Sequence, residues 1–248
     1  MRLLYYLPGV KTVTEGDMGI YVRGGNADQN LIVYDNAVVY NPTHVLGFFS
    51  IFNEDIIDNV RFYKSGIPAS YANRLSSAID IRSVDSIPET ASFSGSLGIL
   101  STKVMGYVPF HNHNGAIYIA ARKSYIDEII KPAANLIFKN QSSVFNSARY
   151  SFYDLNMKAV YRLNLNNKLV VSFYGGKDVF DMEKESADYK NNFFWQNRLI
   201  SINWQHYFNN RNYLENTFYY TNTIFSLTQG KAQSALACSQ ELMISVIN

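Results

Sequence analysis

The strongest constraint on the fold is a near-regular alternation of apolar and polar residues in the segment from Asp154 to Leu163. In an extended strand, successive side chains point to opposite faces, so this pattern gives one apolar and one polar face. The apolar face consists of Leu155, Met157, Ala159, Tyr161 and Leu163, and the polar face of Asp154, Asn156, Lys158 and Arg162. Such a strand is suited to separating an apolar environment from an aqueous one.

The same pattern recurs in residues 195–208, with Ile200, Ile202, Trp204 and Phe208 on one face. Short polar connections at residues 164–167 and 209–212 join neighbouring strands, whereas residues 123–150 and 178–192 form long polar connections. Transmembrane β-barrels alternate short periplasmic turns with longer extracellular loops in this way. The pattern predicts about seven strands of roughly 9–11 residues, the length that crosses a bilayer at a tilt.

The composition agrees with a barrel wall and argues against several other classes of protein. Aromatic residues make up 15% of the chain and charged residues only 17%, against about 25% charged in ordinary soluble domains. The net charge of +2 is spread along the sequence, so no basic patch indicates nucleic acid. The single cysteine, Cys238, cannot form an internal disulfide. No apolar run reaches the length of a membrane-spanning helix, which leaves a barrel open.

The segment from Ile20 to Pro42 has a different character, with short strands separated by turns. Gly24 and Gly25 permit backbone angles that other residues resist, and they follow a short strand. The apolar run Leu31–Tyr34 stops at Asp35-Asn36, a pair suited to a tight turn, after which Ala37–Tyr40 returns as a strand.

These residues resemble the plug domain of TonB-dependent outer-membrane receptors, in particular the Bacteroidetes-type branch. The resemblance continues through Gly47–Asn53, Val60–Ala69 and Arg74–Arg82. It implies a mainly β protein, with a mixed α/β plug domain over residues 1–85 and the first strands of an antiparallel transmembrane β-barrel over residues 90–228. It also implies a place in the outer membrane of a Gram-negative bacterium, with no enzymatic activity and no cofactor.

The resemblance further implies ligand-gated, energy-coupled uptake of a nutrient such as a glycan, a peptide or an iron chelate. The implied partners are TonB, outer-membrane lipid, the nutrient ligand and a surface lipoprotein, with no nucleic acid. Two alternatives stay open. One is a ligand-sensing outer-membrane receptor that signals without transport, and the other is a soluble β-rich binding module.

A plug that shifts inside a barrel without unfolding should be held by polar contacts rather than by a continuous apolar seam. The candidates in the plug turns are Arg23, Gly24, Gly25, Asp28, Asp35 and Arg74. The candidates on the lumen face of the barrel are Arg122, Asp154, Asn156, Lys158 and Arg162. The alternative for each charged residue is an ordinary place on the solvated surface.

Catalytic and metal-binding patterns are weak. His111 and His113 flank Asn112 in an expected turn, where solvated side chains are a better interpretation than metal ligands. His44 and His206 have no partner near them in the sequence. No nucleophile elbow, phosphate loop or zinc-protease motif occurs, so we expect neither a catalytic nor a metal site.

Three further expectations concern local structure and the ends of the chain. Residues 45–57 are a candidate for a helix, and residues 53–60 could form a short helix capped by Asn53. Met1–Pro8 lacks the apolar core of a secretion signal, and about seven strands cannot close a plugged barrel, so we expect a fragment that begins within the plug.

Residues 229–248 lose the alternation and the aromatics. They should be helical or foreign to the fold, with a frameshift or artificial end after about Thr228 favoured over a genuine surface helix.

Overall fold

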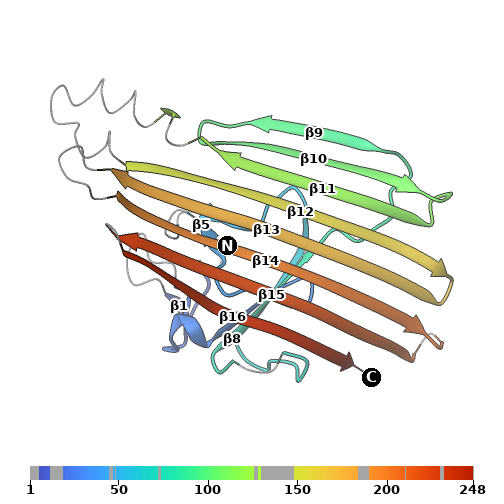
Figure 1. The fold of residues 1–248 in the computed structure, drawn as a ribbon. Coiled ribbons are helices and arrows are strands. Elements are labelled where there is room, and N and C mark those ends of the chain that lie inside the picture. Colours follow the sequence, from blue (N-terminus) through green and yellow to red (C-terminus); the bar gives the residue numbers. More distant parts are fainter. Residues whose placement is uncertain are drawn as a thin grey trace.

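The computed structural model describes residues 6–11, 19–44, 47, 49–71, 74–125, 128–129, 148–183, 190–209, 211–229 and 232–247. Two sheets dominate the fold (Figure 1). A small mixed sheet belongs to the N-terminal part of the chain, and it lies against one face of a large antiparallel sheet formed by the rest.

The N-terminal part, which we call the N-terminal domain, is built from short elements. They are β1 (Val10–Lys11), β2 (Tyr21–Val22), the 3-10 helix Ala27–Gln29, β3 (Asn30–Tyr34), β4 (Ala37–Val38), β5 (Thr43–His44), β6 (Phe49–Ser50), β7 (Ile57–Tyr63) and β8 (Ser77–Ser83). Four of them form a sheet in the order β4-β3-β8-β7, in which β3 and β8 are parallel and the other pairs antiparallel. The pairs β1–β2 and β5–β6 form separate two-stranded ladders.

The large sheet follows the order of the sequence, and every neighbouring pair is antiparallel. Its strands are β9 (Ser92–Leu97), β10 (Ser101–Phe110), β11 (Gly115–Ser124), β12 (Ala148–Asn164), β13 (Asn167–Glu183), β14 (Lys190–Tyr207), β15 (Tyr213–Gln229) and β16 (Ala232–Ile247). The expected mainly β fold with consecutive antiparallel strands is confirmed.

The period-two pattern in β12 and β14 separates two faces, as the sequence predicts. Along β12, Asn156 is buried against the N-terminal domain while Met157, on the opposite face, is 41% exposed. Large apolar side chains are exposed in several neighbouring strands, among them Val104, Val108, Ile117, Ile119, Met157, Leu163, Ile200, Ile202, Trp204, Phe218 and Tyr220. The large sheet therefore has one face covered by the N-terminal domain and one uncovered apolar face.

The helix expected over residues 45–57 is wrong for the continuously described residues 49–57. The segment instead contains β6, a turn and the first residue of β7, while Val45, Leu46 and Phe48 lie outside the described residues. Asn53 accepts from the Asp55 N–H at 3.2 Å, so it organises a turn by the same chemistry that caps a helix. Pairing of β7 with β8 then takes up Ile57 and the residues that follow it.

The helical alternative for residues 229–248 is also wrong, because residues 232–247 form β16. Backbone N–H and C=O groups make the ladder with β15, so a strand here does not require the alternation of side chains that its sequence lacks. Strands β11, β12, β13 and β14 likewise extend into the segments expected to be long connections. Across the described residues, no helix combines the length and the apolar character needed to cross a membrane.

The hairpin between β3 and β4 forms as the sequence indicates, with φ of 45° at Asp35 and 72° at Asn36. Two successive left-handed residues are the geometry of a type I′ turn. Behind this turn, Ile32, Tyr34, Ile79 and Ile81 of the small sheet share one apolar core with Tyr174, Leu199 and Tyr219 of the large sheet. The N-terminal domain is thus joined to the large sheet partly by apolar packing, and not by polar contacts alone.

We expect Gly25→Ala to lower the free energy of unfolding by about 1–3 kcal/mol, as overpacking does elsewhere. A Cβ at residue 25 would lie 2.6 Å from Ser76 Oγ, and that hydroxyl is held by donation to the Val22 carbonyl at 2.8 Å. Urea unfolding of the chain refolded in detergent micelles would measure the change.

The matched control is Gly24→Asn. Gly24 has a φ of +80° but open space around it, and Asn tolerates this conformation better than other residues. The control should cost clearly less than Gly25→Ala, and an equal cost at both positions would contradict the steric explanation.

Candidate functional site

Two clusters of buried polar side chains join the N-terminal domain to the large sheet. The His44 cluster consists of His44, Arg122, Asp154, Tyr174 and Asp178. The Asp35 cluster consists of Asp35, Ser83 and Lys158. Both clusters combine residues that are more than seventy positions apart in the sequence.

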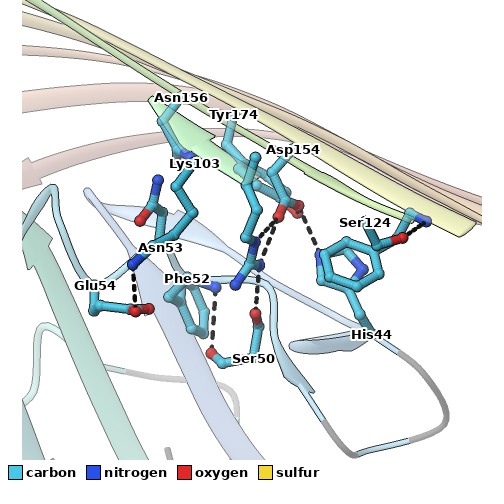
Figure 2. A network of polar contacts seen from close by, with 12 residues as sticks. His44, Ser50, Phe52, Asn53, Glu54, Lys103, Ser124, Asp154, Asn156 and Tyr174 are labelled. Carbon is cyan, nitrogen blue, oxygen red and sulfur yellow. Dashed lines mark hydrogen bonds and ion pairs between the residues drawn. The ribbon is translucent and has the colours of Figure 1, made fainter. Parts of the chain in front are cut away.

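His44 is the centre of the first cluster and is only 1% exposed. Its Nε2 lies 2.6 Å from Asp154 Oδ1 on β12, and its Nδ1 lies 2.6 Å from Asp178 Oδ2 on β13. The ring stacks on Phe152 with centroids 4.4 Å apart. Figure 2 shows the ring projecting from the N-terminal domain toward the strands that carry Asp154 and Tyr174. One side chain therefore bridges two neighbouring strands of the large sheet.

The two carboxylates of this cluster receive donors from four strands. Arg122 on β11 donates through Nε and Nη2 to Asp154 Oδ2 at 2.8 and 2.5 Å, and through Nη2 also to the Ser50 carbonyl at 2.6 Å. Tyr174 on β13 donates to Asp154 Oδ1 at 2.7 Å. Trp195 Nε1 on β14 donates to Asp178 Oδ2 at 2.6 Å, and the Tyr150 hydroxyl on β12 donates to Asp178 Oδ1.

The electrostatics of the cluster follow from burial and from these charges. Burial alone would lower the pKa of His44, but the carboxylates of Asp154 and Asp178 outweigh it and raise the pKa above its ordinary value of 6.5. Burial, followed by the charge of Asp35, raises the pKa of Tyr34 well above its usual range. Tyr34 therefore stays a neutral hydroxyl, and it donates to Asn156 Oδ1 at 2.9 Å.

The Asp35 cluster fixes the tip of the β3–β4 turn. Asp35 accepts from the Ser83 N–H at 2.9 Å, from Ser83 Oγ at 2.5 Å and from Lys158 Nζ at 3.1 Å. Lys158 donates further to the carbonyl and the hydroxyl of Ser83, each at 2.9 Å. Ser201 on β14 donates to the Asp35 carbonyl at 2.6 Å. The turn is thus bound by two strands of the large sheet.

Half-exposed ion pairs lie at the margins of the same interface. Lys103 on β10 contacts Glu54 at 2.6 Å and Asp55 at 3.1 Å. Lys168 on β13 contacts Asp85 at 2.7 Å. Each pair is partly solvated, so each should contribute little to stability.

The structure brings together only some of the residues that the sequence singles out. Five of them meet between the N-terminal domain and the large sheet: Asp35, Arg122, Asp154, Asn156 and Lys158. Arg23, Gly24, Asp28 and Arg162 are exposed, and Gly25 is half-buried beside Ser76. Asp28 and Arg74 line a separate cavity of about 550 Å³, whose wall also includes Trp195 and Phe225.

Sequence reasoning missed His44 and Asp178. The two carboxylates that contact His44 lie 110 and 134 residues away, so no local pattern pointed to it. Asp178 was assigned to a loop, although Tyr174, Gly176 and Asp178 continue one face of β13 at intervals of two. Extending the alternation by one step would have placed Asp178 on the face that meets the N-terminal domain.

A hydrophilic cavity of about 310 Å³ adjoins the Asp35 cluster. Its lining includes Lys158, Ser172, Ser201, Asn203 and Glu215. Within the described parts of the chain, no group of three or more His, Cys, Asp or Glu side chains is arranged to hold a metal ion.

The fold is similar to solved structures of siderophore receptors. The ferric enterobactin receptor PfeA of Pseudomonas aeruginosa, in complex with BCV-L6, matches with a TM-score of 0.62 and 11% identity over 99% of this chain and 42% of that one. The siderophore receptor PirA of Acinetobacter baumannii matches with a TM-score of 0.61 and 10% identity over 99% and 41%. PiuA of the same organism matches with a TM-score of 0.55 and 12% identity over 84% and 31%.

No protein-family model and no curated protein sequence matches the chain. The chain spans about two fifths of the length of the ferric enterobactin receptor and of PirA. At such low identity the likeness concerns the fold, which is that of the corresponding part of TonB-dependent receptors.

We expect Asp154→Asn to destabilise the chain by about 3–5 kcal/mol, the cost of breaking a buried ion pair from one side. Asp154 is 2% exposed. Loss of its carboxylate leaves two buried cations, Arg122 and His44, of which His44 still contacts the carboxylate of Asp178. Urea unfolding in detergent micelles would measure the loss.

Asp85→Asn is the matched control, because the Asp85 side chain is 52% exposed in its pair with Lys168. This change should cost at most about 1 kcal/mol. Comparable losses from the two changes would show that the His44 cluster does not hold the N-terminal domain in place.

Proposed function

We propose that the chain is part of a TonB-dependent outer-membrane receptor for energy-coupled uptake of an iron chelate. In this proposal β9–β16 are part of the barrel wall and residues 1–85 belong to the plug. The observation that carries the proposal is the contrast between the faces of the large sheet. One face holds a folded domain through buried ion pairs, and the other exposes apolar side chains on neighbouring strands.

The connections of the large sheet give its direction in the membrane. The connections β10–β11, β12–β13 and β14–β15 are all short and lie at one end of the sheet, whereas the opposite end carries the longest connection, residues 125–147, as well as the short β9–β10 turn. We assign the end with only short connections to the periplasm. Asp178 and Trp195 are paired nearer the opposite end. The cavity lined by Asp28, Arg74, Trp195 and Phe225 therefore faces the outside, where a ligand would arrive.

The gating role assigned to the plug rests on its polar attachments. Buried ion pairs become hydrated when they separate, so the N-terminal domain can move from the wall at a lower cost than a wholly apolar interface would impose. TonB would supply the force. The exposed apolar face argues against a soluble binding module. A soluble protein rarely exposes apolar side chains on several neighbouring strands unless a partner or a membrane covers them.

Iron chelates are favoured over glycans and peptides because the similar structures are receptors for siderophores. Uptake of ⁵⁵Fe-labelled siderophores by cells that carry the receptor containing this chain would test the proposal. Accumulation should stop when TonB is deleted or the proton-motive force is collapsed. Binding without accumulation in energised cells would favour the signalling receptor instead.

Membrane insertion can be tested on the chain by replacing an apolar residue of the uncovered face. Met157→Arg should weaken folding into lipid bilayers by about 2–4 kcal/mol, the cost of arginine at the bilayer midplane. Leu163 is an exposed residue of β12 beside a short turn, so Leu163→Arg should cost about 0–1 kcal/mol. Urea titration in phospholipid vesicles measures both, and equal costs would contradict the assigned depth.

A further inference from the structure

We infer that His44 docks against Asp154 and Asp178 as an imidazolium, and that loss of one of its two ring N–H protons releases β5 from β12 and β13. The His44 cluster would then be a pH-dependent contact between the N-terminal domain and the large sheet. This pH dependence involves only residues of this chain, so it does not depend on which ligand the receptor binds.

The first step is the hydrogen-bond inventory of the two carboxylates. Asp154 Oδ2 receives the Arg122 guanidinium, and Asp154 Oδ1 receives the Tyr174 hydroxyl. Asp178 Oδ2 receives the Trp195 indole N–H, and Asp178 Oδ1 receives the Tyr150 hydroxyl. Guanidinium and indole groups can only donate. Both aspartates are therefore placed as acceptors, which is the role of ionised carboxylates.

The second step concerns the imidazole ring. Both of its nitrogens lie 2.6 Å from a carboxylate oxygen. A neutral imidazole has one N–H and one lone pair, so one of these contacts would place a lone pair against an ionised oxygen. Only the imidazolium donates on both sides. The geometry thus requires the charged form, and the raised pKa of His44 agrees with it.

The third step is the charge balance of the site. Among the described residues, those that contact His44 or its carboxylates are Arg122 from β11, Tyr150 and Asp154 from β12, Tyr174 and Asp178 from β13, and Trp195 from β14. Two carboxylates face one guanidinium and one imidazolium, which gives a neutral cluster. Deprotonation of His44 leaves one uncompensated negative charge in a buried site, and this favours separation.

The direction of the pH effect follows from the sign of the shift. A raised pKa in the folded state means that the contact is fully present below the ordinary value of 6.5 and is lost as pH rises through the raised value. The Asp35 cluster contains no histidine, the side chain that titrates nearest to neutrality. The β3–β4 turn should therefore remain docked when β5 is released.

The test uses the full chain refolded in detergent micelles with ¹⁵N-labelled histidine. Two-bond ¹H–¹⁵N spectra report the protonation of each ring nitrogen, and the absence of one signal set in His44→Gln identifies His44. We expect both His44 nitrogens to be protonated at pH 7.5, with a titration midpoint above the ordinary histidine value of 6.5. A neutral His44 ring at pH 7.5 would overturn the inference.

A pair of variants tests the cause. Asp178→Asn removes a carboxylate that contacts the ring, so it should lower the His44 midpoint by about 1–3 pH units. Asp181→Asn is the control, because Asp181 lies on the same strand but contacts Asn192, and it should leave the midpoint unchanged. Equal shifts in the two variants would show that the contact with Asp178 does not hold the proton.

Release of β5 has its own readout. Trp195 is 6% exposed and donates to Asp178, so acrylamide quenching of its fluorescence in a Trp204→Phe background should increase at least twofold as His44 loses its proton. In the same background, His44→Gln should remove this pH dependence. Quenching that stays constant through the His44 midpoint would overturn the proposed release.

Discussion

The buried carboxylate of Asp154 is the group on which the arrangement of the two domains depends. It accepts from Arg122, Tyr174 and His44, so one side chain joins three strands of the large sheet to the N-terminal domain. An ionised carboxylate in such a site is costly unless nearly all of its acceptor positions are satisfied. The three donors must therefore lie around Asp154 together. This fixes β11, β12 and β13 relative to one another and holds β5 against them.

The same strands also explain why the two faces of the large sheet differ. Because side chains alternate, each polar residue that meets the N-terminal domain has apolar neighbours on the other face, as Lys158 has Met157 and Ala159. A shift of register by one residue would place Lys158 among the apolar side chains and Met157 against Asp35. The polar clusters thus specify the register of the wall as well as the position of the domain.

The sequence predicts the parts of this fold that depend on local patterns. The alternation in β12 and β14 and the Asp35-Asn36 turn follow from backbone geometry, and the structure shows them as expected. The helix expected near Asn53 fails because a turn uses the same side-chain acceptor. The helical alternative for the segment after Thr228 fails because β15 offers an edge with which an extended backbone can pair. His44 could not be identified, because its role exists only once distant strands are assembled.

The interface combines two kinds of attachment that respond differently to displacement. The apolar core shared by Tyr34, Ile79, Tyr174 and Leu199 loses contact area steeply when the surfaces separate. The ion pairs of His44 and Asp35 exchange their partners for water, which returns much of their hydration energy. Proton loss from His44 would weaken only the second kind. A domain held in this way can be loosened at β5 while its apolar core stays packed, so the first step of displacement does not require unfolding.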